Sequence, residues 1–433
     1  MRLAIIGGGG FRTPLVHQAL AGDDESPISE LALYDVDPER LAVIGNVLGA
    51  RPSPRVRVTL HTGLDAALAG TDFVFCAVRV GGTRGRTIDE RVALDLGVLG
   101  QETAGAGGIA YGLRGVPALT RIARRIAAVA PHAWVINFTN PVGMITEAMA
   151  AVLGDRVIGI CDSPAGLFRR VAWLLGTPVE RVWFDYAGLN HLGWLRAALV
   201  AGADRLPALL ADTGRLSRIE EGRLFGASLL RGLGMIPNEY LYYYYFTADA
   251  IRSAQGQSRG EFLQRQQEAF YGAAASAPPE AYRRWREVLT EREQTYSREA
   301  PAGTGEPTGG GYESMAVAVM KALAGQGPAT LVLNVRNRGA MPGVPSDAIV
   351  EVPCLVDTNG AHPVGGDPLP PDALGLVTAV KEAERTAIAA ASTGSRELAE
   401  AAFARHPLVG DGETARRLVE GYAAAHPELR PLR

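Results

Sequence analysis

Leu3-Ala4-Ile5-Ile6-Gly7-Gly8-Gly9-Gly10 opens the chain and decides its fold. The apolar residues predict a buried strand, and the glycines predict a tight turn into a helix whose N–H groups can approach a pyrophosphate. The usual third glycine of this pattern is replaced by Arg12. A structural strand–helix turn without a cofactor is the alternative. The candidate cofactor-binding residues in this turn are Gly7, Gly9, Gly10, Phe11 and Arg12.

Strands and helices alternate over the first 165 residues. This pattern predicts an α/β fold with an N-terminal, doubly wound, Rossmann-like parallel sheet. The expected strands are Leu3–Ile6, Leu31–Tyr34, Phe73–Val78, Trp134–Phe138 and Val157–Ile160, with crossover helices such as Thr13–Leu20 and Ala118–Ala130. Residues that follow parallel strands meet at one sheet edge, where ligands bind. Here they are Gly7, Asp35, Arg79, Thr139-Asn140-Pro141 and Cys161-Asp162.

Asp35 follows the second predicted strand and is placed to bind a ribose 2′-hydroxyl. Its carboxylate would repel a 2′-phosphate, which favours NAD over NADP. A solvated aspartate beside a structural turn is the alternative.

The pattern changes to mixed helices and strands after residue 165. We therefore expect an NAD-binding domain at residues 1–165 and an α+β catalytic and substrate domain at 166–433, a lactate/malate dehydrogenase-like arrangement. The expected elements of the second domain are helices Gly166–Leu175, Glu220–Leu233, Gly260–Tyr271, Pro279–Arg298 and Tyr312–Ala324, strands Leu331–Val335 and Ile349–Val352, and a glycine-rich loop at Pro301–Gly311.

Composition excludes several classes of protein. A net charge of -3 provides no basic surface for nucleic acid or an anionic membrane. Only 3 cysteines, without regular spacing, argue against a disulfide framework and for a reducing compartment. The start of the chain has a strand pattern and not a signal peptide, and no apolar run reaches the roughly 18 residues of a membrane span. We expect a cytoplasmic protein.

Cys161 and His191 are a candidate metal pair. A thiolate and an imidazole favour zinc or another thiophilic ion, and a site with two protein ligands stays open for substrate oxygens. The alternatives are a buried core cysteine and a structural histidine.

Two further segments carry charge or aromatic rings. Arg79, Arg84, Arg86 and Arg91 surround Gly81-Gly82, and their guanidinium groups suit an anionic substrate unless they form a solvated charge run. The segment Asn238–Tyr245 is the densest aromatic stretch, for which core packing is the default. A tyrosine acts as a base only where a nearby cation lowers its pKa from about 10.

Together these motifs resemble glycoside hydrolase family 4, the NAD- and divalent-metal-dependent glycosidases, and within it the 6-phospho-β-glucosidase branch. The likeness keeps order and spacing nearly end to end. The matching segments are Gly7–Pro14, Arg79–Gly82 leading to Asp89-Glu90, Gly100-Gln101-Glu102-Thr103, Asn137–Pro141, Cys161–Pro164, Gly188–Leu192, Asn238–Tyr244, Asn334–Gly339 and Val350–Val356.

The resemblance implies an exception to two-carboxylate glycoside hydrolysis. NAD takes a hydride from C3 of the sugar, a base removes the C2 proton, and the metal stabilises the resulting anion. The aglycone leaves from C1, water adds, and the hydride returns. The expected substrate is a small phosphorylated disaccharide or glycoside, and family habit implies a homodimer or homotetramer.

The resemblance also implies a role for each matching residue. Cys161 and His191 match the metal ligands, with Mn2+ the expected ion, and Tyr240 matches the C2 base. Asp162 matches a general acid. The matching substrate-binding residues are Asn140 and Asn190 at the sugar, and Arg86 and Arg259 at a 6-phosphate.

This chain departs from the family pattern at two positions. Gly10 stands where the family loop usually has serine, so either Arg12 compensates or the anionic group of the substrate differs. Many β-specific members have asparagine at the position of Asp162. The aspartate of this chain resembles that of the phospho-α-glucosidases. The anomer, the 6-phosphate requirement and the aglycone stay open. So do two different activities, a net NAD-dependent dehydrogenase of sugars or hydroxy acids and a non-catalytic NAD sensor.

Overall fold

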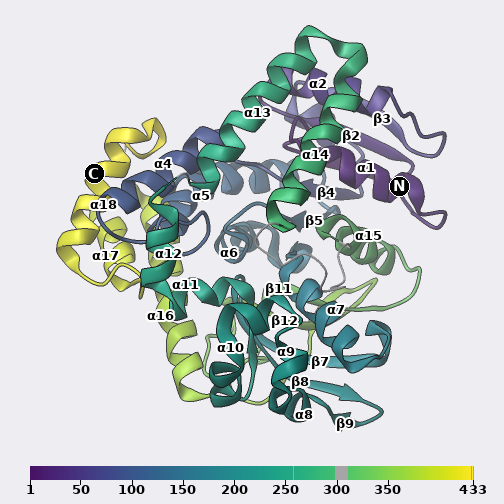
Figure 1. Ribbon diagram of the computed structural model, residues 1–433. Coiled ribbons are helices and arrows are strands. Elements are labelled where there is room, and N and C mark those ends of the chain that lie inside the picture. The colour runs from purple at the N-terminus through teal and green to yellow at the C-terminus, as the bar shows by residue number, and fades with distance from the viewer. Residues whose placement is uncertain (257, 298–310, 431, 433) are drawn as a thin grey trace.

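A computed structural model describes residues 1–433 except 257, 298–310, 431 and 433. The N-terminal parallel sheet lies at one end of the molecule and an antiparallel region at the other, with the C-terminal helices along one side (Figure 1). Residues 301–310 of the predicted glycine-rich loop fall outside the described part of the chain.

The strands lie in one mixed sheet. They are β1 (Arg2–Ile6), β2 (Glu30–Tyr34), β3 (Arg57–His61), β4 (Phe73–Cys76), β5 (Trp134–Asn137), β6 (Val157–Gly159), β7 (Val182–Leu189), β8 (Leu192–Val200), β9 (Ala203–Asp204), β10 (Ile236–Pro237), β11 (Ala329–Arg336), β12 (Ile349–Asp357) and β13 (Gly360–Pro363).

Helices cover both faces of this sheet. They are α1 (Thr13–Gly22), α2 (Pro38–Gly49), α3 (Leu64–Leu68), α4 (Gly82–Asp95), α5 (Gly105–Val129), α6 (Val142–Leu153), α7 (Ser163–Leu175), α8 (Leu206–Ala211), α9 (Thr213–Leu216), α10 (Glu220–Leu233), α11 (Tyr242–Tyr245), α12 (Thr247–Ala254), α13 (Arg259–Ser276), α14 (Ala281–Ser297), α15 (Tyr312–Leu323), α16 (Pro371–Thr393), α17 (Arg396–Arg405) and α18 (Gly412–Ala425).

The parallel half has the order β3-β2-β1-β4-β5-β6, which confirms the predicted doubly wound, Rossmann-like parallel sheet. Side chains along β1 alternate between two cores: Leu3 and Ile5 face one, Ala4 and Ile6 the other. The five predicted strands are all present within two residues of their expected ends.

An antiparallel half continues the same sheet beyond β6, in the order β11-β12-β7-β8-β10. The register places one row of paired residues across both halves. The row runs Tyr34, Ile6, Cys76, Asn137, Gly159, Asn334, Glu351, Gly188 and Gly193. It lies at the carboxyl ends of the parallel strands, so Asn334 and Glu351 reach the edge where the predicted site residues follow β1, β2, β4, β5 and β6.

The elements that differ from expectation include β3, α5, β7 and β8. The edge strand β3 was missed because its alternating pattern contains arginine and histidine and little apolar area. Helix α5 begins at Gly105, well before the predicted Ala118: its first turns are rich in glycine and buried, and Pro117 lies inside the helix. The β7–β8 hairpin was also missed, although it places His191 in its tight turn.

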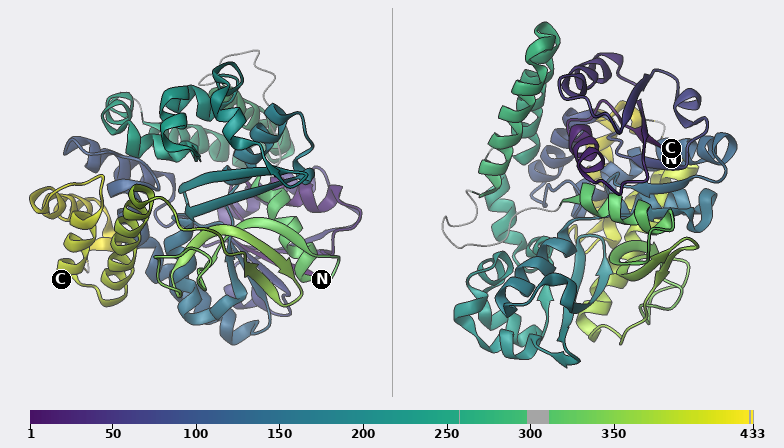
Figure 2. Two further views of the ribbon diagram at one scale, coloured as in Figure 1. Left: turned by 90° about the horizontal axis from the view of Figure 1, so that it is seen from below. Right: turned by 90° about the vertical axis from the view of Figure 1, so that its right-hand side faces the viewer.

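Two helical units of the second half pack on the first. The α13–α14 hairpin stands like a column beside the N-terminal half (Figure 2), with α13 against α4 and α2. The C-terminal helices α16 and α17 pack on α5, and α18 packs on α4. Across the described residues, no helix combines the length and apolar character that a membrane span requires.

Candidate active site

The glycine turn after β1 is shaped by backbone contacts. The N–H groups of Gly7 and Gly8 donate to Tyr34 O at 2.9 and 2.7 Å, and Gly10 N–H donates to Gly7 O at 2.9 Å. Gly7 has φ +92, and a Cβ there would lie 2.3 Å from Ala77 O, so only glycine fits. The turn leads directly into α1. All four glycine N–H groups are thus bonded within the protein, so the N-terminus of α1 is the part of this segment that suits the pyrophosphate of a dinucleotide.

Asp35 contacts this turn directly. Its Oδ2 accepts from Gly9 N–H at 2.9 Å, and its Oδ1 accepts from Asp37 N–H at 3.0 Å. The carboxylate therefore braces the turn, and its contact with a ribose stays a prediction.

Phe11 and Arg12 point away from the turn into the second half. Phe11 is buried and packs edge-on against Phe270, with ring centroids 5.3 Å apart. The Arg12 guanidinium lies over the Tyr312 ring, 5.3 Å from its centroid. Any contact of Phe11 with a cofactor would therefore be made by its backbone.

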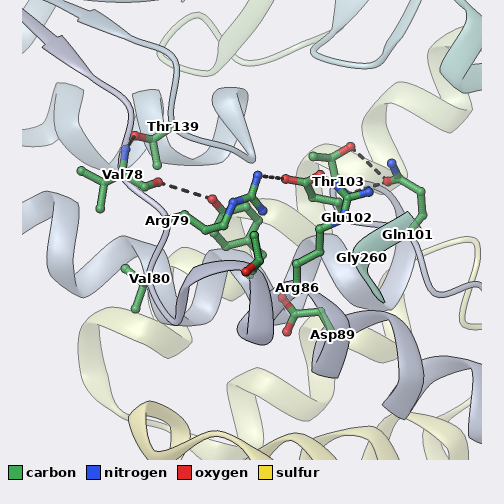
Figure 3. Close-up of polar contacts among 12 residues, drawn as sticks. Val78, Arg79, Val80, Arg86, Asp89, Gln101, Glu102, Thr103, Thr139 and Gly260 are labelled. Atoms are coloured by element: carbon green, nitrogen blue, oxygen red, sulfur yellow. Dashed lines mark hydrogen bonds and ion pairs between the residues drawn. The ribbon is translucent and has the colours of Figure 1, made fainter. Parts of the chain in front are cut away.

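Three of the four predicted arginines, Arg79, Arg86 and Arg91, are paired with carboxylates and do not form a solvated run. Glu102 bridges Arg79 and Arg86 (Figure 3), and Arg86 Nε donates to Glu90 Oε1 at 2.7 Å. Arg91 pairs with Glu261 at 2.6 Å, whereas Arg84 is exposed. Burial alone would raise the pKa of Glu102, but the two guanidinium groups bring it down to about 2.

Arg259 begins α13 next to Arg86. The neighbouring Gly260 N–H donates to Glu90 Oε2 at 2.8 Å, and a Cβ at Gly260 would lie 3.2 Å from Arg86 Cγ. The structure thus brings together the two arginines predicted to contact a phosphate, on α4 and α13.

His191 occupies the turn between β7 and β8 with φ 62. Its ring stacks face to face on Tyr240, with centroids 3.6 Å apart and planes 1° from parallel. Tyr240 is held by its N–H, which donates to Asn238 Oδ1 at 3.0 Å. The predicted metal ligand and the predicted base therefore lie in contact.

Gln101 and Thr103 determine which ring nitrogen of His191 carries its proton. Gln101 Oε1 accepts from the N–H groups of Thr103 and Ala104, so it is the carbonyl oxygen. It also accepts the Thr103 hydroxyl proton at 3.1 Å. Thr103 Oγ1 must then accept from His191 Nδ1–H at 2.7 Å. Burial lowers the pKa of His191 to about 4, so Nε2 of the neutral ring carries a lone pair for a ligand.

Cys161 follows β6 and is buried. Burial raises the pKa of its thiol well above the ordinary value, and the carboxylates of Glu351 and Asp162 raise it further, followed by Glu239. Two of these carboxylates belong to residues at the His191 turn: Glu239 precedes Tyr240, and Glu351 accepts a hydrogen bond from Asn190.

Glu351 is a buried hub beneath the site. It accepts hydrogen bonds from Asn190 Nδ2 at 3.1 Å, Asn334 Nδ2 at 2.8 Å and Tyr186 Oη at 3.2 Å. Burial raises its pKa to about 7, and these three donors only partly offset that effect. Because the Asn190 amide nitrogen donates to Glu351, its Oδ1 is directed elsewhere as an acceptor.

Several buried acceptors around this hub have no hydrogen-bond partner within the described chain. They are Asn140 Oδ1, Glu239 Oε2 and Asn334 Oδ1. Burial also raises the pKa of Glu239 to about 7, which Arg170 partly offsets. Unpaired buried acceptors destabilise a fold unless a ligand supplies donors, and sugar hydroxyls are such donors.

Asp162 precedes α7, within electrostatic reach of Cys161 and Arg169. In the aromatic segment, Tyr242, Tyr244 and Tyr245 pack against the core as expected by default, and Tyr240 stacks on His191.

The donor set fits a divalent metal. Within the described ranges, no three His, Cys, Asp or Glu side chains form a ready-made metal cluster. Cys161 and His191 would be a two-ligand set, and the charges that act most strongly on Cys161 are carboxylates. A divalent cation would stabilise the thiolate in this negative surrounding and leave positions open for substrate oxygens.

Sequence reasoning did not assign Thr103, Glu102, Glu239, Asn334 or Glu351 to the site. A usable signal was present for the last two. Glu351 interrupts the apolar run Ile349–Cys354 and Asn334 interrupts Leu331–Val335, and isolated polar residues within buried strands need a specific partner.

Comparison with known proteins gives a family match over most of the chain. The model described as "Family 4 glycosyl hydrolase" matches residues 2–177, and "Family 4 glycosyl hydrolase C-terminal domain" matches residues 186–409. A 6-phospho-beta-glucosidase of Escherichia coli is 31% identical and covers 100% of this chain and 96% of its own.

Two solved structures are similar over nearly the whole length. The 6-phospho-beta glucosidase from Thermotoga maritima with NAD and glucose-6-phosphate has a TM-score of 0.87 and 28% identity, covering 99% of this chain and 98% of that one. A 6-phospho-alpha-glucosidase from gut microorganisms in complex with NAD and Mn2+ has a TM-score of 0.81 and 26% identity, covering 98% and 97%. Relatives of both anomeric types are thus close.

Proposed function

The chain belongs to glycosyl hydrolase family 4, and from that membership we propose that it is an NAD- and Mn2+-dependent 6-phospho-β-glucosidase. The β preference rests on the E. coli and T. maritima relatives, which carry that name. The NAD and Mn2+ requirement rests on the solved relatives that hold them and on the fit of the glycine turn, Cys161 and His191 to these groups.

The stack of His191 on Tyr240 is the observation that carries this proposal. It brings the proposed C2 base within contact of a proposed metal ligand, on a ring whose Nε2 lone pair faces away from Thr103. The metal, held by Cys161 and His191, would supply positive charge that acidifies the C2 proton and lowers the pKa of a neighbouring phenol.

Each step of the proposed reaction is then assigned to particular residues of the chain. Tyr240 removes the C2 proton of the bound sugar, while Asp162 donates a proton to the oxygen of the leaving aglycone. Asn190 presents Oδ1 to a sugar hydroxyl because Glu351 holds its amide nitrogen. NAD, held by the turn at Gly7–Gly10 and by Asp35, would accept the hydride from C3 and return it, so that the cycle consumes no cofactor.

A panel of nitrophenyl glucosides tests the proposal. α- and β-anomers, each with and without a 6-phosphate, are assayed with NAD and Mn2+. Nitrophenol release from the 6-phospho-β-glucoside, without lasting NADH accumulation, is expected, and turnover in D2O should place deuterium at C2. Lasting NADH accumulation would instead identify a net dehydrogenase, and NAD binding without turnover would identify a sensor.

Two observations favour close alternatives. Asp162 is the residue type expected in phospho-α-glucosidases, which the α-anomers of the panel detect. Two nitrogens of Arg86 already contact Glu90 and Glu102, so its charge is partly neutralised. Hydrolysis of the glucosides without phosphate would identify a non-phosphorylated substrate.

A further inference from the structure

Three side chains from the second half of the chain donate hydrogen bonds to carbonyls of the glycine turn and the residues after it. Tyr271 Oη donates to Gly9 O at 2.7 Å, Trp285 Nε1 to Phe11 O at 2.9 Å, and Tyr312 Oη to Arg12 O at 3.1 Å. They come from α13, α14 and α15 respectively, and each is more than 250 residues away in sequence.

These bonds act on the orientation of the loop's N–H groups. In a planar trans peptide the C=O and the following N–H point in opposite directions. A donor that holds Gly9 O therefore fixes the direction of Gly10 N–H, which closes the turn onto Gly7 O. A donor on Phe11 O likewise directs the Arg12 N–H to the opposite side, at the start of α1, where an anion binds.

The side chain of Phe11 anchors the same loop. It is inserted between Phe270 and Trp285, and the Arg292 guanidinium lies 3.9 Å from its ring centroid. The loop is thus held both by its backbone carbonyls and by a buried ring.

The first turns of α13 contact the other candidate subsite. Gly260 N–H donates to Glu90, Arg91 pairs with Glu261, and Thr87 Oγ1 donates to Gln264 at 2.9 Å. All three contacts join α13 to α4, the helix that carries Arg86. At 1.5 Å per residue, Tyr271 lies roughly 18 Å along α13 from Arg259, the first residue of the helix. One helix therefore spans from the candidate phosphate subsite to the glycine turn.

We infer that Tyr271 and Tyr312 are positioning residues for the dinucleotide cofactor, which hold the glycine turn in its binding conformation. The inference rests on the proposed NAD requirement. Each hydroxyl raises the fraction of free protein molecules whose glycine turn already has the conformation that binds NAD. The apparent dissociation constant for NAD falls as this fraction rises. Trp285 acts in the same way, but its replacement would also remove a large buried ring.

Calorimetric titration with NAD tests the inference in the variants Tyr271→Phe and Tyr312→Phe, which lose only a hydroxyl. We expect each to bind NAD about threefold to tenfold more weakly. With substrate, KM for NAD should rise by the same factor while kcat at saturating NAD is kept. Tyr282→Phe is the matched control, because its half-buried ring packs on Trp285 in the same hairpin but its hydroxyl makes no hydrogen bond among the described residues.

The outcomes separate the inference from the proposed function. Wild-type affinity in both variants would overturn the positioning role alone. Equal weakening by Tyr282→Phe would overturn it as well, since hairpin packing and not the hydroxyls would then set the affinity. A wild-type protein that binds no NAD would overturn the proposed function itself.

Discussion

At the scale of single residues, the candidate active site depends on the neighbouring residues that orient its side chains. The Thr103 hydroxyl selects the tautomer of His191, and Glu351 orients the amide of Asn190. Neither supporting residue would need to touch the substrate. The chemistry proposed for His191 and Asn190 therefore depends on partners that are distant in sequence.

Replacing Thr103 by valine should weaken metal binding, because His191 Nδ1–H loses its acceptor and the ring loses its fixed orientation. We expect Mn2+ affinity to fall roughly 10- to 100-fold. Electron paramagnetic resonance of free Mn2+ during titration measures this directly. Thr103→Ser keeps the hydroxyl and should stay near wild type, and an unchanged affinity in Thr103→Val would contradict the role given to Thr103.

Glu351→Gln should change how stability depends on pH. The folded protein raises the pKa of Glu351 to about 7 from 4.5, so between these values it holds a proton that the unfolded chain has lost. Wild-type stability from this group therefore falls as pH rises through that window. Relative to wild type, the variant should gain on the order of 3 kcal/mol between about pH 5 and pH 8. Urea unfolding at both pH values, with metal chelated, measures this, and a pH-independent difference would contradict it.

Residue types at the site could be predicted from the sequence more readily than their partners. Cys161 and His191 stood out because a thiol and an imidazole carry recognisable chemistry, whereas only the family resemblance singled out Tyr240 within its aromatic stretch. Glu102 did not stand out, because its role arises from two arginines that the fold brings to it, Arg79 after β4 and Arg86 on α4. The catalytic and metal-binding roles assigned to Cys161, His191 and Tyr240 stay predictions.

At the scale of elements, apolar patterns in the sequence predict buried strands, but they do not predict contacts between segments that are far apart in the sequence. Apolar runs predicted β1, β2 and β4–β6, since buried parallel strands are nearly all apolar. The same rule could not reveal β7 and β8, whose mixed sequence forms a hairpin only against β12. The α13 helix was predicted from its periodicity, but its contacts with the glycine turn depend on residues that lie far apart in the sequence.

The start of α13 is stabilised by a capping box. Ser258 Oγ accepts from Glu261 N–H at 3.3 Å, and Glu261 Oε2 accepts from Ser258 N–H at 3.0 Å. Ser258→Ala should lower the free energy of unfolding by about 1 kcal/mol. Chemical denaturation measures the loss, and faster hydrogen exchange in the first turn of α13 should accompany it. Unchanged hydrogen exchange in this first turn would show that the ion pair with Arg91, and not the capping box, holds Glu261 in place.

At the scale of the whole molecule, we expect the fold not to depend on the proposed metal. The described core is a continuous packing of apolar side chains on both faces of the sheet, and the candidate ligands lie at its edge. A homodimer or homotetramer and a boundary at residues 165 and 166 stay predictions.

Chelation should therefore abolish activity without unfolding the protein. After dialysis against EDTA, we expect loss of nitrophenol release, restored by Mn2+, with unchanged helical circular dichroism. Thermal unfolding should shift by no more than the loss of a bound ligand explains. Collapse of the circular dichroism signal on chelation would assign the metal a structural role instead.

The single row of paired residues across the sheet has a consequence for dissecting this protein. Gly159 and Asn334 join the parallel and antiparallel halves, and a Cβ at Gly159 would lie 2.8 Å from Asn334 Cβ. Cutting the chain near residue 165 would leave β6 and β11 as open edges, which readily pair with other chains. Separately expressed halves should therefore aggregate or recombine, because each would expose a strand edge that the intact chain covers.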